Sequence, residues 1–299
     1  MTASSISIRM YNVGFGDSFL LRFPCTGGER TMLIDCGFHQ AGPGPYPIEK
    51  VVDQIIADTT KGKQAHIDVV VATHRHRDHV LGFESAKWQN VQVGEVWMPW
   101  TEDPKDPAAR KIRETQSKKA NALCTALRAA KVPARILEIA ENALTNFKAM
   151  ATLHSGFAGN PVRRFLPPPK RGKATFTPDI LPGLTIHAMG PSHDPKVIRD
   201  MNPPKGESFL QLAQDGNGNG SIPLPFDSRF RMKEKEAQKW LSEAGIGPRQ
   251  LKAIEKMAQE NPLALAVALD AAVNGTSLML MFEMGKAFLL FPGDAQWGT

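Results

Sequence analysis

Short apolar runs, each bounded by glycine or proline, fill the first hundred residues of the chain. Some alternate with polar residues, as in a strand with one buried face, and others are continuous, as in a strand buried on both faces. Residues 67–73 show the clearest pattern of a buried strand, because five of these seven side chains are apolar. Strands are therefore predicted at residues 6–10, 19–23, 31–34, 67–73 and 93–97, and a helix at about 48–58.

Helical and strand patterns mix in the rest of the chain. Residues 105–155 are rich in Ala, Lys, Arg, Glu and Leu and predict two helices, broken near Pro133. The patterns that follow predict short strands within 161–192, helices within 230–272, and a strand pair at 277–282 and 287–291. The fold class is therefore α/β or α+β, with helical insertions on a β scaffold.

Composition places the chain among soluble globular proteins. Of 299 residues, 42% are hydrophobic and 22% charged, which excludes disordered and fibrous classes. No apolar stretch reaches the roughly 18 to 20 residues of a membrane helix, and the N-terminus has no secretory pattern, so we expect a cytoplasmic protein without a membrane partner.

The chain has three cysteines, Cys25, Cys36 and Cys124, and we expect their thiols to be reduced and buried. A disulfide between Cys25 and Cys36 is an alternative.

One segment carries a concentration of metal-binding side chains. Directly after the predicted buried strand, residues 73–79 read Thr-His-Arg-His-Arg-Asp-His. Histidine is the commonest zinc ligand, and carboxylates join it in catalytic sites. His74 and His76 would point the same way from an extended backbone, whereas Asp78 and His79 can turn toward a second point nearby. The spacing therefore suits two adjacent metal ions, and a solvent-exposed charged loop is a poor alternative.

This pattern resembles the signature of the metallo-β-lactamase-fold hydrolases, which is His-x-His-x-Asp-His after a strand. Residues 13–20 look like the opening hairpin of the branch related to the hydrolase domain of bacterial DNA-uptake channel proteins. Residues 33–37 are similar to the family's strand-end Leu-Ile-Asp-x-Gly. Residues 274–278 and 289–295 resemble that branch's Asn/Ser element and its metal-bridging Gly-Asp.

The resemblance implies a fold and a site. The fold would be a single αββα sandwich over residues 1–299, with helical insertions at about 105–155 and 195–272. A metal-bound hydroxide, formed from water held between two ions, would attack the substrate. Asp78 and His79 are the expected catalytic residues, Asp78 also orienting the nucleophile. The implied metal ligands are His74 and His76 for the first ion, Asp78 and His79 for the second, and Asp294 as the bridge.

The resemblance also bears on Asp35, on His193 and on the residues after Asp294. The resemblance implies that Asp35 accepts a hydrogen bond from a ligand histidine, although at a strand end before Gly37 it is equally a turn residue. His193 is the best-placed candidate for an extra ligand to the first ion. A last histidine for the second ion is expected after Asp294 but does not occur, so we expect the 299 residues to be truncated, naturally or otherwise, or to be one piece of a longer protein.

The expected function is metal-dependent hydrolysis, with zinc the first choice and manganese an alternative. A net charge of +6 and the branch resemblance favour a phosphodiester, nucleic acid or nucleotide substrate. Basic groups at 163–164, 170–173 and 229–235 could line a phosphate channel or be solvated faces. Hydrolysis of a small ester, thioester or lactam remains open, as does a non-catalytic binding module with an incomplete site. The sequence does not indicate the oligomeric state.

Overall fold

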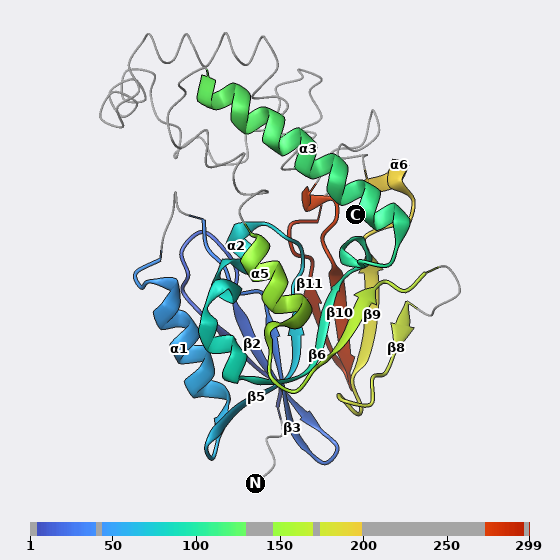
Figure 1. Cartoon of the computed structure of the whole chain (residues 1–299). Coiled ribbons are helices and arrows are strands. Elements are labelled where there is room, and N and C mark those ends of the chain that lie inside the picture. The colour runs from blue at the N-terminus through green and yellow to red at the C-terminus, as the bar shows by residue number, and fades with distance from the viewer. Residues whose placement is uncertain (1–4, 40–43, 130–145, 170–173, 199–272, 296–298) are drawn as a thin grey trace, which may run out of the picture. The chain divides into compact units, whose positions relative to one another are not determined.

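The structure of the chain is a computed structural model (Figure 1). It describes residues 5–39, 44–129, 146–169, 174–198, 273–295 and 299. The chain divides into two compact units, Met1–Met201 with Ala266–Thr299, and Asn202–Leu265. All described residues belong to the first unit. The helices predicted within 230–272 lie outside the described residues, and the single-domain interpretation stays a prediction.

The larger sheet contains the strands predicted in the first hundred residues. Its order is β1-β2-β3-β5-β6-β7, with the short β4 paired to β5. The pairs β1–β2 and β2–β3 are antiparallel, whereas β3, β5, β6 and β7 run parallel, so their carboxyl ends share one edge. The strands are β1 (Ser7–Met10), β2 (Phe19–Cys25), β3 (Gly28–Ile34), β4 (Thr60–Lys61), β5 (Gln64–Val71), β6 (Gln92–Pro99) and β7 (Val162–Leu166).

The second sheet is antiparallel and has the order β11-β10-β9-β8. Its strands are β8 (Thr175–Phe176), β9 (Thr185–Gly190), β10 (Met279–Met284) and β11 (Ala287–Phe291). The hairpin between β10 and β11 turns at Gly285, whose φ of +61° is a left-handed conformation that glycine adopts without a Cβ clash. The strand pair predicted near the end of the sequence is thereby confirmed.

Helices flank the larger sheet and connect its strands. The predicted insertion at 105–155 contains α3 and α5, and residues 130–145 between them, with Pro133, lie outside the described residues. Each helix that the structure describes is too short or too polar to cross a lipid bilayer. The helical segments are α1 (Ile48–Thr59), α2 (Arg77–Val80), η1 (Leu81–Glu84), η2 (Ala86–Asn90), η3 (Trp100–Glu102), α3 (Pro107–Ala129), α5 (Phe147–Ala151), η4 (Thr152–Gly156) and α6 (Pro195–Ile198).

Two apolar cores lie on opposite faces of the larger sheet. Trp97 and Phe282 belong to the core between the two sheets, and Ile55 and Trp88 to the core under the helices. Figure 1 shows the same layers, with α1 and α5 on one side of the larger sheet and β9 and β10 on the other. The mixed α/β architecture predicted from the sequence is confirmed and agrees with a metallo-β-lactamase fold.

The three cysteines are free and buried, as predicted. Cys25 packs in the core between the sheets and Cys36 in the core under the helices, so the sheet separates them. Because a disulfide needs Cβ atoms about 3.8 Å apart, the alternative of a Cys25–Cys36 bond is wrong.

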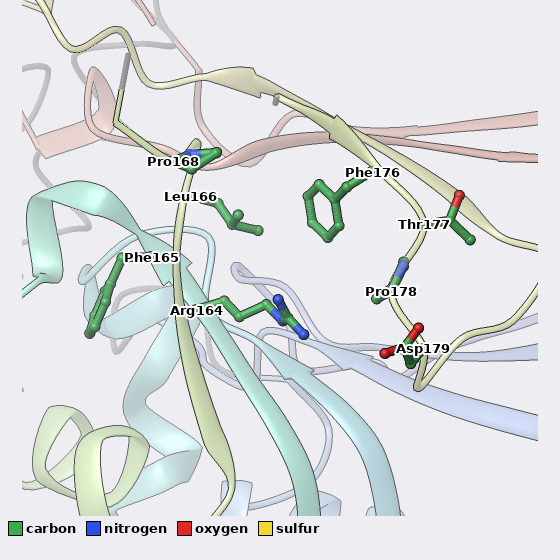
Figure 2. Close-up of a pocket in the computed structure, with 8 residues that line it drawn as sticks. All are labelled: Arg164, Phe165, Leu166, Pro168, Phe176, Thr177, Pro178 and Asp179. Carbon is green, nitrogen blue, oxygen red and sulfur yellow. The ribbon is translucent and has the colours of Figure 1, made fainter. Parts of the chain in front are cut away.

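One cavity of about 490 Å³ lies between β7 and β8 (Figure 2). Leu166 and Phe176 supply apolar walls, and Arg164 and Asp179 supply charge. The guanidinium of Arg164 donates two hydrogen bonds to the carboxylate of Glu95, from Nε at 2.5 Å and from Nη2 at 2.7 Å. Its charge is therefore largely satisfied within the protein, which weakens the expectation that it contacts phosphates.

Candidate metal centre

The site forms at the carboxyl edge of the parallel strands. Ile34, at the end of β3, pairs with Val71, at the end of β5, so the loops that follow these strands lie side by side. Thr73 joins this edge to the second sheet, because its carbonyl accepts the N–H of Leu278 at 2.7 Å. Gly293 packs so closely that a Cβ there would lie 2.9 Å from the Cβ of Thr73. The topology thus brings the two halves of the predicted ligand set together.

Three of the predicted ligands form a first group: His74, His76 and Asp294. Nε2 of His74 lies 3.1 Å from Nδ1 of His76, and 3.8 Å from Oδ2 of Asp294. Two nitrogens bound to one tetrahedral zinc, each about 2.1 Å from it, stand about 3.4 Å apart. The spacing of the group therefore fits a single ion, and both histidines are about 1% exposed.

A second group, Asp78, His79 and Asp294, shares its aspartate with the first. Nε2 of His79 lies 3.4 Å from Oδ1 of Asp294 and 3.9 Å from Oδ2 of Asp78. The two oxygens of Asp294 therefore face different histidines, Oδ2 toward His74 and Oδ1 toward His79. This is the arrangement that a carboxylate bridging two ions requires.

Asp35 lies behind the ligands and is 1% exposed. Its Oδ1 accepts the backbone N–H of Thr73 at 2.7 Å, and its Oδ2 accepts the Thr73 hydroxyl at 2.6 Å. Oδ2 also lies 2.9 Å from Nδ1 of His79. Asp35 has a φ of +57°, a turn conformation that Asp and Asn tolerate. It therefore makes the turn and also contacts His79, one of the predicted ligands; its role toward a bound metal stays a prediction.

The surroundings shift the pKa values of His74 and His79 in opposite directions. Burial, and the nearby rings of His79 and His76, hold the pKa of His74 well below its ordinary 6.5, so it is a neutral donor. Burial alone would lower the pKa of His79 too, but hydrogen bonds with Asp294 and Asp35 raise it well above 6.5. The same contact with His79 lowers the pKa of Asp294, against the effect of burial. The site thus combines a neutral imidazole with carboxylates that attract positive charge, a donor set that suits cations.

Asp17 was not singled out from the sequence, although it stands within the motif at residues 13–20. Its Oδ2 lies 3.9 Å from Nδ1 of His79. Burial raises its pKa from 3.8 to about 6, and the charges of Asp35, Asp294 and Asp78 add to this, while His79 opposes it. No sequence spacing relates Asp17 to the histidine cluster, and only the fold brings them together.

Arg75 and Glu102 are a second relationship that the sequence did not reveal. Arg75 stands between two predicted ligands, and its guanidinium pairs with Glu102 at 2.9 and 2.6 Å. Glu102 follows β6 in η3 and is 4% exposed. Arg113 of α3 donates to the carbonyls of Thr101 and Asp103 on either side of it. Residues 73–79, the loop of the predicted metal ligands (the metal-ligand loop), are thereby connected to the first turns of the helical insertion.

His193 lies in neither ligand group of the described residues. Its ring stacks on Trp100, with centroids 4.5 Å apart, and its Nε2 lies 3.0 Å from the carbonyl oxygen of Pro167. Its role as an extra ligand stays a prediction. His187 of β9 lies 2.9 Å from Glu283 and 3.1 Å from Thr175 in a cross-strand cluster.

The comparisons with known proteins agree with this geometry at the level of the superfamily. Nothing matches the chain among curated proteins or among solved structures. The branch related to DNA-uptake proteins therefore stays a prediction. A family model, the metallo-beta-lactamase superfamily, matches residues 11–203, well over half of the chain. The chain therefore belongs to the metallo-beta-lactamase superfamily, most of whose members are metal-dependent hydrolases.

Proposed function

We propose that this protein is a metal-dependent hydrolase of phosphodiesters, in nucleic acids or nucleotides. The observation that carries the proposal is the convergence of three histidines and two aspartates at one sheet edge, in two groups that share Asp294. All ligand atoms within each group lie within 4.8 Å of one another. Imidazole and carboxylate side chains gathered in this way are the donor set with which proteins bind divalent cations.

We assign each side chain to a metal ion from the distances between the ligand atoms. His74 and His76 would hold a first ion, Asp78 and His79 a second, and Asp294 both. Divalent ions in such a site polarise the substrate and generate a nucleophile from water near neutral pH. Asp35 keeps the proton of His79 on Nδ1, so that Nε2 presents its lone pair to the site. Asp78, which is 6% exposed, would orient the attacking water.

Zinc is the first choice of metal because the first group has two imidazoles, and manganese the alternative because the second is rich in carboxylates.

The net charge of +6 supports a polyanionic substrate. Arg164 is paired with Glu95, and Arg163 donates to the carbonyls of Leu153 and Pro161, so these two guanidinium groups do not support the proposed phosphate contacts. The groups at 170–173 and 229–235 lie outside the described residues. Free buried thiols support a cytoplasmic location.

Metal analysis and two model substrates test this proposal. Purified protein should contain two ions per chain and release nitrophenol from bis-nitrophenyl phosphate faster than it hydrolyses a thioester. His76→Ala and Asp294→Ala should abolish the activity, whereas His66→Ala, on an exposed histidine of β5, should leave it unchanged. Fewer than one ion per chain would favour a non-catalytic binding module. Two ions with a preference for the thioester would favour the small-ester alternative.

A further inference from the structure

The loop of residues 14–18 packs against the metal-ligand loop. The backbone N–H of Asp17 donates to the carbonyl of Asp78 at 3.1 Å, and its own carbonyl accepts the N–H of Gly37 at 3.1 Å. At Gly16, a Cβ would lie 2.6 Å from the carbonyl oxygens of Asp78 and Gly37, so only glycine allows this approach. The backbone thus fixes Asp17 from two sides, independently of its carboxylate.

That carboxylate faces the side of His79 opposite the two ligand groups. Oδ2 of Asp17 lies 3.9 Å from Nδ1 of His79, and Oδ2 of Asp35 lies 2.9 Å from the same nitrogen. Nε2, at the other side of the ring, faces Asp294 and Asp78. Two carboxylates therefore stand behind one imidazole, and two more stand in front of it.

The trio of Asp17, Asp35 and His79 is close enough to suggest a further cation site, but the hydrogen bonds argue against one. Asp35 already accepts two bonds from Thr73, at 2.7 and 2.6 Å, in addition to its contact with His79. A cation would have to displace these buried bonds. Asp17 differs, because its side chain is 35% exposed and its position does not depend on them.

We propose that Asp17 is a second positioning residue for His79, an inference that rests on the metal site assigned under the proposed function. Asp35 fixes the ring through a direct hydrogen bond. Asp17 adds a negative charge beside the same Nδ1–H. This charge favours the His79 tautomer that carries its proton on Nδ1, and it strengthens the electron pair that Nε2 offers to a metal ion. It also connects the β1–β2 loop to the ligand loop, so that the charge stays in place when the ion binds.

The test compares three aspartate variants of the full chain in two measurements. Competition with a chromogenic chelator gives the zinc affinity, and the visible spectrum after cobalt substitution reports on the ligands around the ion. Asp17→Asn keeps the shape and the backbone bonds, and we expect it to weaken binding of one of two ions about tenfold and to shift the cobalt bands. Asp17→Glu keeps the charge and should recover most of the affinity. Asp53→Asn, on an exposed residue of α1 paired with Lys87, should change neither measurement.

Unfolding of the chelator-treated proteins separates positioning from a structural role. Asp17→Asn should unfold at the same temperature as the unmodified chain or above it, because the substitution removes one carboxylate from a cluster of four. Unchanged affinity and unchanged cobalt bands would overturn the role of Asp17 while leaving the proposed function intact. A loss of affinity matched by unfolding at a lower temperature would also overturn it. Absence of metal binding in the unmodified chain would overturn both proposals.

Discussion

Glu102 and Arg75 form a bidentate ion pair beneath the metal-ligand loop, with Nε 2.9 Å from Oε1 and Nη2 2.6 Å from Oε2. Both side chains are largely buried, 4% and 14% exposed. Arg75 stands between His74 and His76, so the pair holds the backbone between two of the predicted ligands. We therefore expect the arrangement of the site to depend on a contact that includes none of the predicted ligand atoms.

Glu102→Gln should destabilise the protein by about 3–5 kcal/mol, because it leaves the buried charge of Arg75 without its partner. Urea unfolding of the metal-free protein measures this free energy. Glu29→Gln is the matched control, since Glu29 pairs with Arg22 at 3.2 Å with both side chains more than a quarter exposed. Its cost should stay within about 1 kcal/mol. Equal losses in the two variants would contradict the importance of the buried pair.

The same pair predicts a dependence on pH. Burial alone would raise the pKa of Glu102, but the charge and hydrogen bonds of Arg75 hold it below its ordinary 4.5. A carboxyl whose pKa is lower in the folded state stabilises that state above pH 4.5, and this contribution is lost as pH falls through the folded pKa. The unfolding free energy of the unmodified protein should therefore fall more steeply below pH 4.5 than that of Glu102→Gln. Parallel profiles would show that Glu102 does not titrate as described.

Asp35→Asn should reduce metal affinity about 10- to 100-fold without preventing folding. Asparagine tolerates the left-handed backbone at this position, where φ is +57°, so the variant keeps the turn while it removes the charge beside His79 and one of the two acceptor oxygens. Competition with a chelator measures the affinity.

Asp58→Asn provides the control for that experiment. Asp58 is also hydrogen-bonded, to Tyr11 at 2.7 Å and to Arg9 at 2.8 Å, but in a different part of the fold. We expect it to lose stability while binding metal normally. A similar loss of affinity in both variants would mean that Asp35 acts only through stability.

Sequence patterns predicted the parts of the structure that depend on neighbouring residues. The continuous apolar run at 67–73 is buried on both faces of β5, with helices on one side and the second sheet on the other, which is why it could be recognised. His74, His76, Asp78 and His79 were found because the loop after one strand carries all four.

Relationships between distant segments could not be predicted in this way. Asp17 reaches His79 only because Gly16 lets the first hairpin touch the ligand loop, and Glu102 lies 27 residues from Arg75. Asp294 was found through its resemblance to a family motif, since Gly-Asp by itself indicates only a turn. The prediction for His193 followed its place after a strand, but stacking on Trp100 gives its ring another partner.

The core between the two sheets provides a prediction about the fold itself. Phe282 of β10 is 1% exposed and packs edge-on against Phe23 of β2, with ring centroids 5.9 Å apart. Phe282→Ala should therefore cost about 3–5 kcal/mol, measured by urea unfolding, because it opens a cavity between the layers that carry Thr73 and Asp294. Phe288→Ala, in the neighbouring strand β11 but 59% exposed, should change stability by no more than about 0.5 kcal/mol. A small effect at Phe282 would mean that the sheets do not share this core, and the joint between the two halves of the metal centre would then need another explanation.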